Sequence, residues 1–126
     1  MAYQKFTAPI ICKIANDGKS YELRVGFGYY RKDNEKDIII VPAGFVSDGF
    51  TNLGFHGLVQ KFGKGLKCAI LHDYLYEVGA KEGISRKEAD DIFLEAMLET
   101  KAFCRFKSYF LYYCVRLGAK KHYNKA

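Results

Sequence analysis

The first third of the chain carries the alternation of apolar and polar side chains that is typical of β-strands. Residues 5–14 suit an extended strand, and residues 21–30 alternate apolar and charged positions at their start, as a half-buried strand does. Residues 38–41 are all apolar and predict a short buried strand that Pro42 ends. Polar stretches rich in turn residues separate these segments. We therefore predict an antiparallel β-meander of about three strands.

Beyond Pro42 the pattern changes twice. Residues 43–57 contain four glycines and predict an ordered, glycine-rich loop. Helical spacing of apolar residues then follows, and it predicts three helices at roughly 65–79, 85–100 and 103–122. Strands that come first and helices that come after indicate an α+β fold. With no repeat and no linker in view, we expect one domain over residues 1–126.

The start of the second predicted helix carries the clearest local signal. Ser85 and Glu88 have the spacing of a capping box, and Ile84 and Ala89 stand where a hydrophobic staple would be. We expect this helix to begin directly after Ser85.

The composition supports a folded chain with one modest core. Apolar residues make up 49% of the 126 positions, which excludes disorder. No apolar run approaches the roughly 18 residues that a membrane helix needs, and residues 1–20 lack the apolar core of a signal peptide. We expect no transmembrane segment and a protein that stays in the cytoplasm where it is made.

The four cysteines show no metal-ligand spacing. Each of them has apolar neighbours, and free cysteine behaves as a small core hydrophobe. We therefore expect buried thiols and no structural zinc. The residues concerned are Cys12, Cys68, Cys104 and Cys114.

The formal net charge of +6 permits an acidic partner. Much of this charge stands near the C-terminus, in Arg116, Lys120, Lys121 and Lys125. Such a basic end is usually solvated, and no nucleic-acid-binding motif is legible. Nucleic acid is therefore disfavoured as a partner.

The candidate chemistry lies on the first two predicted helices. At about 100° per residue, His72 and Tyr76 stack one turn apart beside the buried stripe, while Asp73 points about 100° away from His72. On the next helix Asp90 borders the apolar face, and Asp91 faces solvent. A carboxylate at the edge of a core needs a partner. We expect His72 to reach Asp90, directly or through Tyr76.

Two interpretations of this arrangement are open. It is either a structural hydrogen bond between helices, or a functional site to which the glycine-rich loop contributes Asp48. Asp48 itself has the alternative role of capping a turn ahead of Gly49.

Three blocks of the sequence resemble a known family. "VPAGFVSDGFT" at 41–51, "AILHDYLYE" at 69–77 and "SRKEADDIFLEAM" at 85–97 resemble, in this order, domain of unknown function 1353. The chain departs from the family pattern after Thr51. The resemblance implies a phage-encoded or prophage-encoded protein with no agreed activity, located in the cytoplasm of the bacterial host or associated with the virion.

The His72-Asp73 pair is also locally similar to the helix that carries the active site of secreted phospholipase A2 enzymes, although their cysteine pattern is absent. This similarity implies that His72 is a general base for water, that Asp73 binds the metal, and that Asp90 and Tyr76 orient the histidine. The HD phosphohydrolases share a His-Asp pair, but His56 does not have the spacing of their further histidine.

Two functional hypotheses follow. In the first, the protein is a metal-assisted hydrolase of an ester or amide, with an envelope component as a candidate substrate. His72, Asp90 and Tyr76 form its catalytic group, and Asp73 with Asp48 holds a divalent ion, calcium or zinc. In the second, it is a non-catalytic phage protein that binds a virion or host-defence component through exposed tyrosines and the basic third helix.

Overall fold

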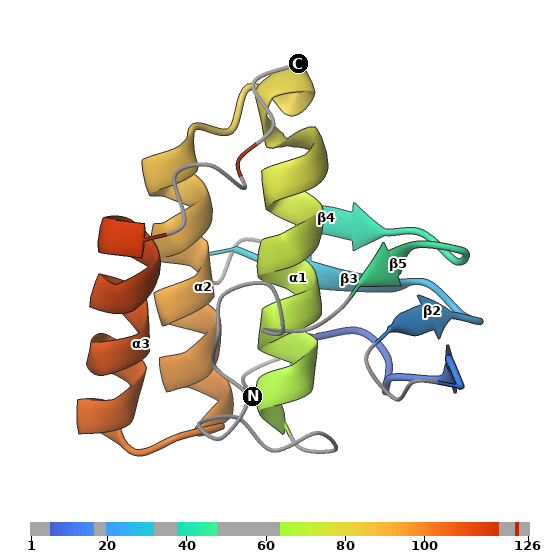
Figure 1. Ribbon diagram of the computed structural model, residues 1–126, viewed down its shortest axis with the longest axis horizontal. Coiled ribbons are helices and arrows are strands. Elements are labelled where there is room, and N and C mark those ends of the chain that lie inside the picture. The colour runs from blue at the N-terminus through green and yellow to red at the C-terminus, as the bar shows by residue number, and fades with distance from the viewer. Residues whose placement is uncertain (1–5, 17–19, 32–37, 48–63, 119–122, 124–126) are drawn as a thin grey trace. The chain divides into compact units, whose positions relative to one another are not determined.

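The computed structural model describes residues 6–16, 20–31, 38–47, 64–118 and 123 (Figure 1). The chain forms two compact units, Met1–Asp48 and Gly49–Ala126. The expected single-domain organisation stays a prediction. Strands occupy the first unit and helices the second, which confirms the α+β fold class.

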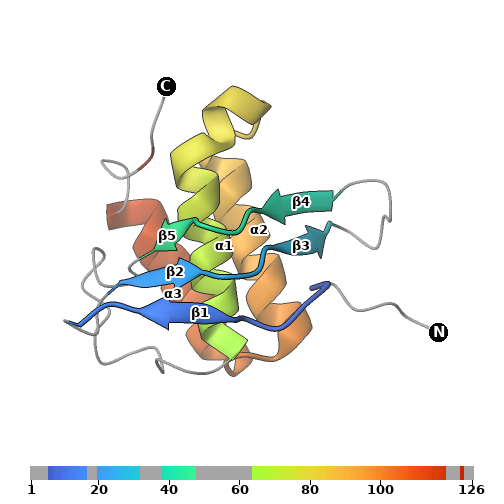
Figure 2. The same ribbon diagram turned by 90° about the vertical axis from the view of Figure 1, so that its right-hand side faces the viewer.

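Among the described residues the N-terminal unit has five short strands, β1 (Cys12–Ile14), β2 (Tyr21–Leu23), β3 (Phe27–Tyr30), β4 (Ile38–Val41) and β5 (Val46–Ser47). They form two antiparallel sheets, one with the order β1-β2-β5 and one that pairs β3 with β4 (Figure 2). The antiparallel pairing agrees with the predicted meander, but there are more strands, and they are shorter than predicted.

The strand predicted over residues 21–30 is divided between β2 and β3. Gly26 lies in the break, where an added Cβ would stand only 2.8 Å from the carbonyl oxygen of Val41. The close approach of two backbone segments therefore requires glycine here and bends the chain away from one continuous strand. Leu23, Tyr29 and Val41 are fully buried and form the centre of this unit's core.

The C-terminal unit consists of α1 (Lys64–Val78), a short 3₁₀ helix η2 (Gly79–Glu82), α2 (Arg86–Thr100) and α3 (Arg105–Gly118). Within this unit α2 lies between α1 and α3 (Figure 1). The first two predicted helices agree with the structure to within one residue at each end. The third begins two residues later than predicted, and residues 119–122 lie outside the described part of the chain. No helix among the described residues is long and apolar enough to span a membrane.

The ends of α2 are fixed locally. The Ser85 hydroxyl accepts a hydrogen bond from the backbone N–H of Glu88 at 3.1 Å, as the capping box predicts. Ahead of it, Gly83 follows the last residue of η2 as its C-cap, and its φ of 76° is in the left-handed region that glycine adopts without strain. This tight connection sets α1 and α2 side by side, so that the buried faces of the two helices meet.

The core of the helical unit is built from all three helices. α1 is buried over most of its circumference, α2 buries one face, and α3 buries a narrow stripe. The large apolar side chains that are fully buried here are Ile70, Leu71, Leu75, Ile92, Phe93, Met97, Leu111 and Val115.

The prediction of four buried thiols is wrong for Cys104, which is exposed. Cys104 directly precedes α3, and its Sγ accepts a hydrogen bond from the backbone N–H of Lys107 at 3.5 Å, so the thiol caps the helix instead of packing in the core. Cys12 and Cys114 are half-buried. Cys68 is buried as predicted, and burial raises the pKa of its thiol to about 12.

Candidate functional site

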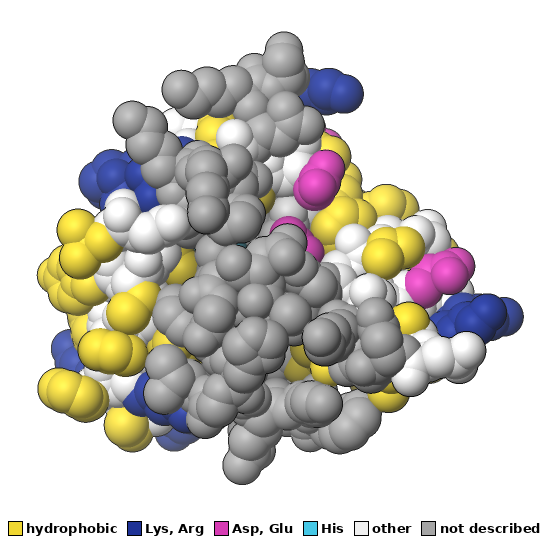
Figure 3. Space-filling view, in the orientation of Figure 1, with side chains coloured by type: hydrophobic (Ala, Val, Ile, Leu, Met, Phe, Trp, Pro, Cys, Tyr) yellow, Lys and Arg dark blue, Asp and Glu magenta, His cyan; other side chains and the backbone are white. Residues whose placement is uncertain are grey.

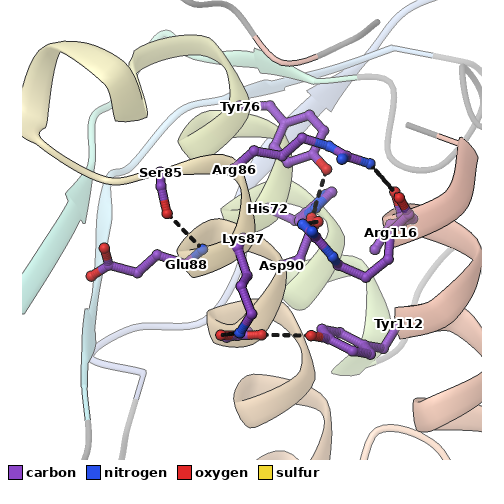
Figure 4. Close-up of polar contacts among 11 residues, drawn as sticks. His72, Tyr76, Ser85, Arg86, Lys87, Glu88, Asp90, Tyr112 and Arg116 are labelled. Carbon is purple, nitrogen blue, oxygen red and sulfur yellow. Dashed lines mark hydrogen bonds and ion pairs between the residues drawn. The ribbon is translucent and has the colours of Figure 1, made fainter. Parts of the chain in front are cut away.

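The carboxylate of Asp90 on α2 is the centre of the candidate site. It is fully buried and receives three side-chain hydrogen bonds (Figure 4). His72 Nε2 lies 2.7 Å from Oδ1, the Tyr76 hydroxyl donates to the same oxygen at 2.6 Å, and Arg116 Nη1 donates to Oδ2 at 2.8 Å. We call these four residues the Asp90 cluster. The expectation that His72 reaches Asp90, directly or through Tyr76, is confirmed in its direct form.

The helical spacing of α1 positions the two aromatic members of the cluster. His72 and Tyr76 stand one turn apart, and the centroids of their rings are 4.2 Å from each other. Phe93 of α2 contacts the imidazole with a centroid distance of 4.7 Å. His72 and Tyr76 are both at most 3% exposed. Packing on both sides therefore fixes the imidazole in the orientation that places Nε2 against Asp90.

Arg116 is the member of the cluster that the sequence analysis misplaced. The sequence predicts a solvated basic end that includes Arg116, whereas the structure pairs Arg116 with a buried carboxylate. The signal that could have found it is the spacing on α3. Leu111 and Val115 define the buried face, and the position after Val115 lies at its edge, where a cation can neutralise Asp90. The other residues of the predicted basic end, Lys120, Lys121 and Lys125, lie outside the described residues.

Arg86, at the start of α2, was also missed. Its Nη2 donates to the backbone carbonyls of Val115 and Arg116, at 2.7 Å in both cases. These carbonyls belong to the last turn of α3, which has no intrahelical partners for them. Arg86 thus anchors the end of α3 that carries Arg116. Its positive charge also helps to lower the pKa of His72, after burial, and opposes the rise in the pKa of Tyr76.

The two adjacent aspartates of α2 have the different environments that the sequence predicted. Asp90 is buried, whereas the side chain of Asp91 is 45% exposed. Asp91 pairs with Lys87 at 2.8 Å and accepts a hydrogen bond from the Tyr112 hydroxyl at 2.7 Å. Asp91 is therefore a natural control for Asp90, because it has the same chemistry and the neighbouring position but lies at the surface.

The electrostatics of the cluster favour a carboxylate beside a neutral imidazole. Burial lowers the pKa of His72, and the hydrogen bond that His72 donates to Asp90 opposes this only in part. Burial alone would raise the pKa of Asp90, but the hydrogen bonds from His72, Tyr76 and Arg116 outweigh it and hold the pKa below its usual value. Burial together with the Asp90 contact raises the pKa of Tyr76, which stays a phenol.

These charge states determine which nitrogen of His72 carries its proton. An ionised carboxylate only accepts hydrogen bonds, so a neutral imidazole that contacts it must present N–H. Nε2 is therefore protonated, and Nδ1 is the nitrogen with a lone pair. The Asp90 carboxylate therefore fixes the tautomer of His72. A neutral imidazole with a free lone pair on Nδ1 can accept a proton at neutral pH.

The same charge states predict a loss of stability in acid. Histidine in the unfolded chain titrates near 6.5 and His72 in the folded chain titrates lower, so the unfolded state binds the extra proton as the pH falls below about 6.5. The free energy of unfolding should then fall by up to about 1.4 kcal/mol per pH unit. Asp90, whose folded pKa lies below 3.8, adds a second loss below about pH 3.8. Urea unfolding of wild type and His72→Asn between pH 7 and 5 measures the first loss. Equal pH slopes in the two proteins would contradict the assignment of a neutral, buried His72.

The predicted metal ligands are not brought together within the described part of the chain. Asp73 is half-buried on α1, and Asp48 lies outside the described residues. In the segments that the structure describes, no three His, Cys, Asp or Glu side chains form a group that could hold a metal ion. The described residues thus do not by themselves fit a metal, and the calcium or zinc site stays a prediction.

Comparison with known proteins identifies a family but no activity, substrate or partner. The family model described as "Protein of unknown function (DUF1353)" matches residues 21–115, which is well over half of the chain and includes all of the Asp90 cluster except Arg116. No curated protein and no solved structure gives a significant match.

Proposed function

We propose a function from the site itself, because the chain belongs to the DUF1353 family, whose description names no activity. The proposed function is hydrolysis of an ester or amide bond with His72 as the general base. The observation that carries it is the 2.7 Å contact between His72 Nε2 and a buried Asp90 carboxylate. Burial of this contact keeps the imidazole neutral, and the contact leaves Nδ1 to accept a proton.

In the proposed reaction, Nδ1 of His72 takes a proton from a water molecule as the water oxygen attacks the carbonyl carbon of the substrate. The imidazolium that forms carries a positive charge 2.7 Å from the Asp90 carboxylate, which stabilises it. The proton then passes from Nδ1 to the leaving alkoxide or amine, and the imidazole returns to its neutral form. Asp90 is thus a positioning residue, and Tyr76 and Arg116 hold it in place.

The origin and setting of the reaction belong to the same proposal. A phage-encoded protein in the host cytoplasm or on the virion would meet envelope components as substrates. Calcium or zinc bound by Asp73 and Asp48 would polarise the substrate carbonyl, but no step above depends on it. The second candidate function is non-catalytic binding of a virion or host-defence component, and the exposed aromatic side chains of α3 favour it.

Replacement of His72 tests the hydrolase proposal. Wild type, His72→Asn and the control Asp91→Asn are assayed against soluble chromogenic esters and anilides and a short-chain phospholipid, with folding checked by circular dichroism. We expect His72→Asn to fold and to lose at least about 10²-fold in kcat/KM, because it lacks the base. Asp91→Asn should retain wild-type rates, since Asp91 lies at the surface.

Two results would contradict the proposal. One is hydrolysis by His72→Asn at the wild-type rate, and the other is a folded wild type that cleaves none of these substrates with or without added calcium or zinc. The second result would favour the non-catalytic alternative.

A further inference from the structure

The outer face of α3 carries an apolar stripe that the helical unit leaves exposed. Phe106 is 80% exposed, Phe110 46%, Tyr113 58% and Leu117 87%. Their spacing of four, three and four residues places them within about 60° of one another around the helix, in a line about 16 Å long. Leu111 and Val115, which α3 buries, lie on the opposite side. Figure 3 shows hydrophobic side chains gathered over α3 along the left edge of the view, with Lys and Arg side chains among them.

The part of the sequence that carries this stripe has charges of one sign only. Residues 101–126 contain seven Lys or Arg and no Asp or Glu, so they account for the entire net charge of +6, and residues 1–100 are close to neutral. On α3 itself, Arg105 and Lys107 lie about 100° to either side of Phe106. Arg105 is exposed, and Lys107 is half-buried with its Nζ 4.8 Å from the centroid of the Phe103 ring. At its N-terminal end, beside Phe106, the apolar stripe therefore has a basic side chain on each edge.

We propose that the outer face of α3 binds the surface of an anionic lipid membrane. A helix with an apolar stripe that lies parallel to the membrane inserts it at the boundary between head groups and acyl chains, while basic side chains at the edges meet anionic head groups. Phe106 and Leu117, at the two ends of the stripe, are the most exposed and would enter deepest. Tyr113 has an apolar ring and a polar tip, which suits the same interface.

Other partners fit the observations less well. A second copy of this chain would bring two segments of equal positive charge together, which costs free energy. Nucleic acid is bound mainly through phosphates, and here the centre of the face is apolar, with a leucine at its most exposed position. The inference goes beyond the proposed hydrolysis and does not depend on it, because the four residues of the stripe and the basic side chains beside it, Arg105 and Lys107, lie outside the Asp90 cluster.

Co-sedimentation with vesicles tests the inference on the full chain. The probes are vesicles of phosphatidylcholine alone and of phosphatidylcholine with 30% phosphatidylglycerol, in 0.1 M and 0.5 M NaCl. We expect wild type to bind the anionic vesicles at least tenfold more tightly than the neutral ones, and to lose most of this binding at the higher salt concentration. His72→Asn should bind like wild type, which separates this test from the test of hydrolysis.

The variant Phe106→Ser/Leu117→Ser should lose at least tenfold in binding while its circular dichroism spectrum stays unchanged, because both side chains are exposed. Ile40→Ser, at a position that is 57% exposed in the other unit, is the matched control and should bind like wild type. Three results would overturn the inference: no binding to anionic vesicles, wild-type binding by Phe106→Ser/Leu117→Ser, or tighter binding to a duplex DNA oligonucleotide than to the vesicles. The last result would assign the face to nucleic acid.

Discussion

Asp90→Ala should lower the free energy of unfolding by about 3–5 kcal/mol, the loss that follows when one partner of a buried ion pair is removed. The change leaves the N–H of His72 and the hydroxyl of Tyr76 without their acceptor in a site at most 3% exposed. It also leaves the Arg116 guanidinium without its counter-charge. The side chain of Arg116 is 29% exposed and can recover part of its hydration, so we do not expect a larger loss. Urea unfolding at pH 7 measures the effect.

Asp91→Ala is the matched control. It removes the same group at the neighbouring position, but Asp91 and its partner Lys87 have side chains 45% and 68% exposed. Exposed ion pairs contribute about 0–1 kcal/mol, so a loss below about 1 kcal/mol is expected. Equal losses in the two variants would show that the Asp90 cluster does not hold the three helices together.

Asp90→Asn should reduce kcat by about two to four orders of magnitude and change KM little, because it reverses the tautomer of His72. An amide has one acceptor oxygen and one donor NH₂. All of the neighbours of Asp90 donate to it, and the charged Arg116 donates most strongly. The amide oxygen will therefore face Arg116, and the NH₂ will face His72 Nε2. That nitrogen must then become the acceptor, the proton moves to Nδ1, and the base is lost.

Tyr76→Phe separates this effect from a general loosening of the site. It removes one hydrogen bond to Asp90 Oδ1 and keeps the carboxylate, so the tautomer of His72 is unchanged. We expect it to lose less than about tenfold in kcat. If Tyr76→Phe and Asp90→Asn lose the same activity, the orientation of Asp90 matters and the tautomer does not.

The sequence predicted the part of the site that lies on neighbouring helices. His72, Tyr76 and Asp90 follow from helical periodicity, because their positions relative to the apolar faces can be calculated and a short connection sets α1 beside α2. The capping box at Ser85 fixed the start of α2 and therefore the phase of Asp90 on its helix. Local rules were sufficient for these residues.

The residues that were missed depend on how a third helix packs. Arg116 reaches Asp90 across 26 positions of sequence, and Arg86 reaches the backbone of α3 across 29 and 30. The spacing on α3 places Arg116 at the edge of the buried face, but no local pattern shows that Asp90 is the group it meets there. The division of residues 21–30 into two strands also depends on a contact between segments that are distant in the sequence. The backbone at Gly26 packs against the backbone at Val41. Cys104 was misjudged because its neighbours are apolar although its position is a helix cap.

The role of His72 as a base depends on its protonation state at pH 7, which nitrogen-15 NMR of the imidazole rings measures. The chain has three histidines, and the signals that His72→Asn removes identify the ring in question. We expect a neutral ring with the proton on Nε2 and an unprotonated Nδ1 in wild type and in Tyr76→Phe, and the opposite tautomer in Asp90→Asn. A wild-type ring that carries its proton on Nδ1, or one that is doubly protonated at pH 7, would contradict the proposal that His72 is the base.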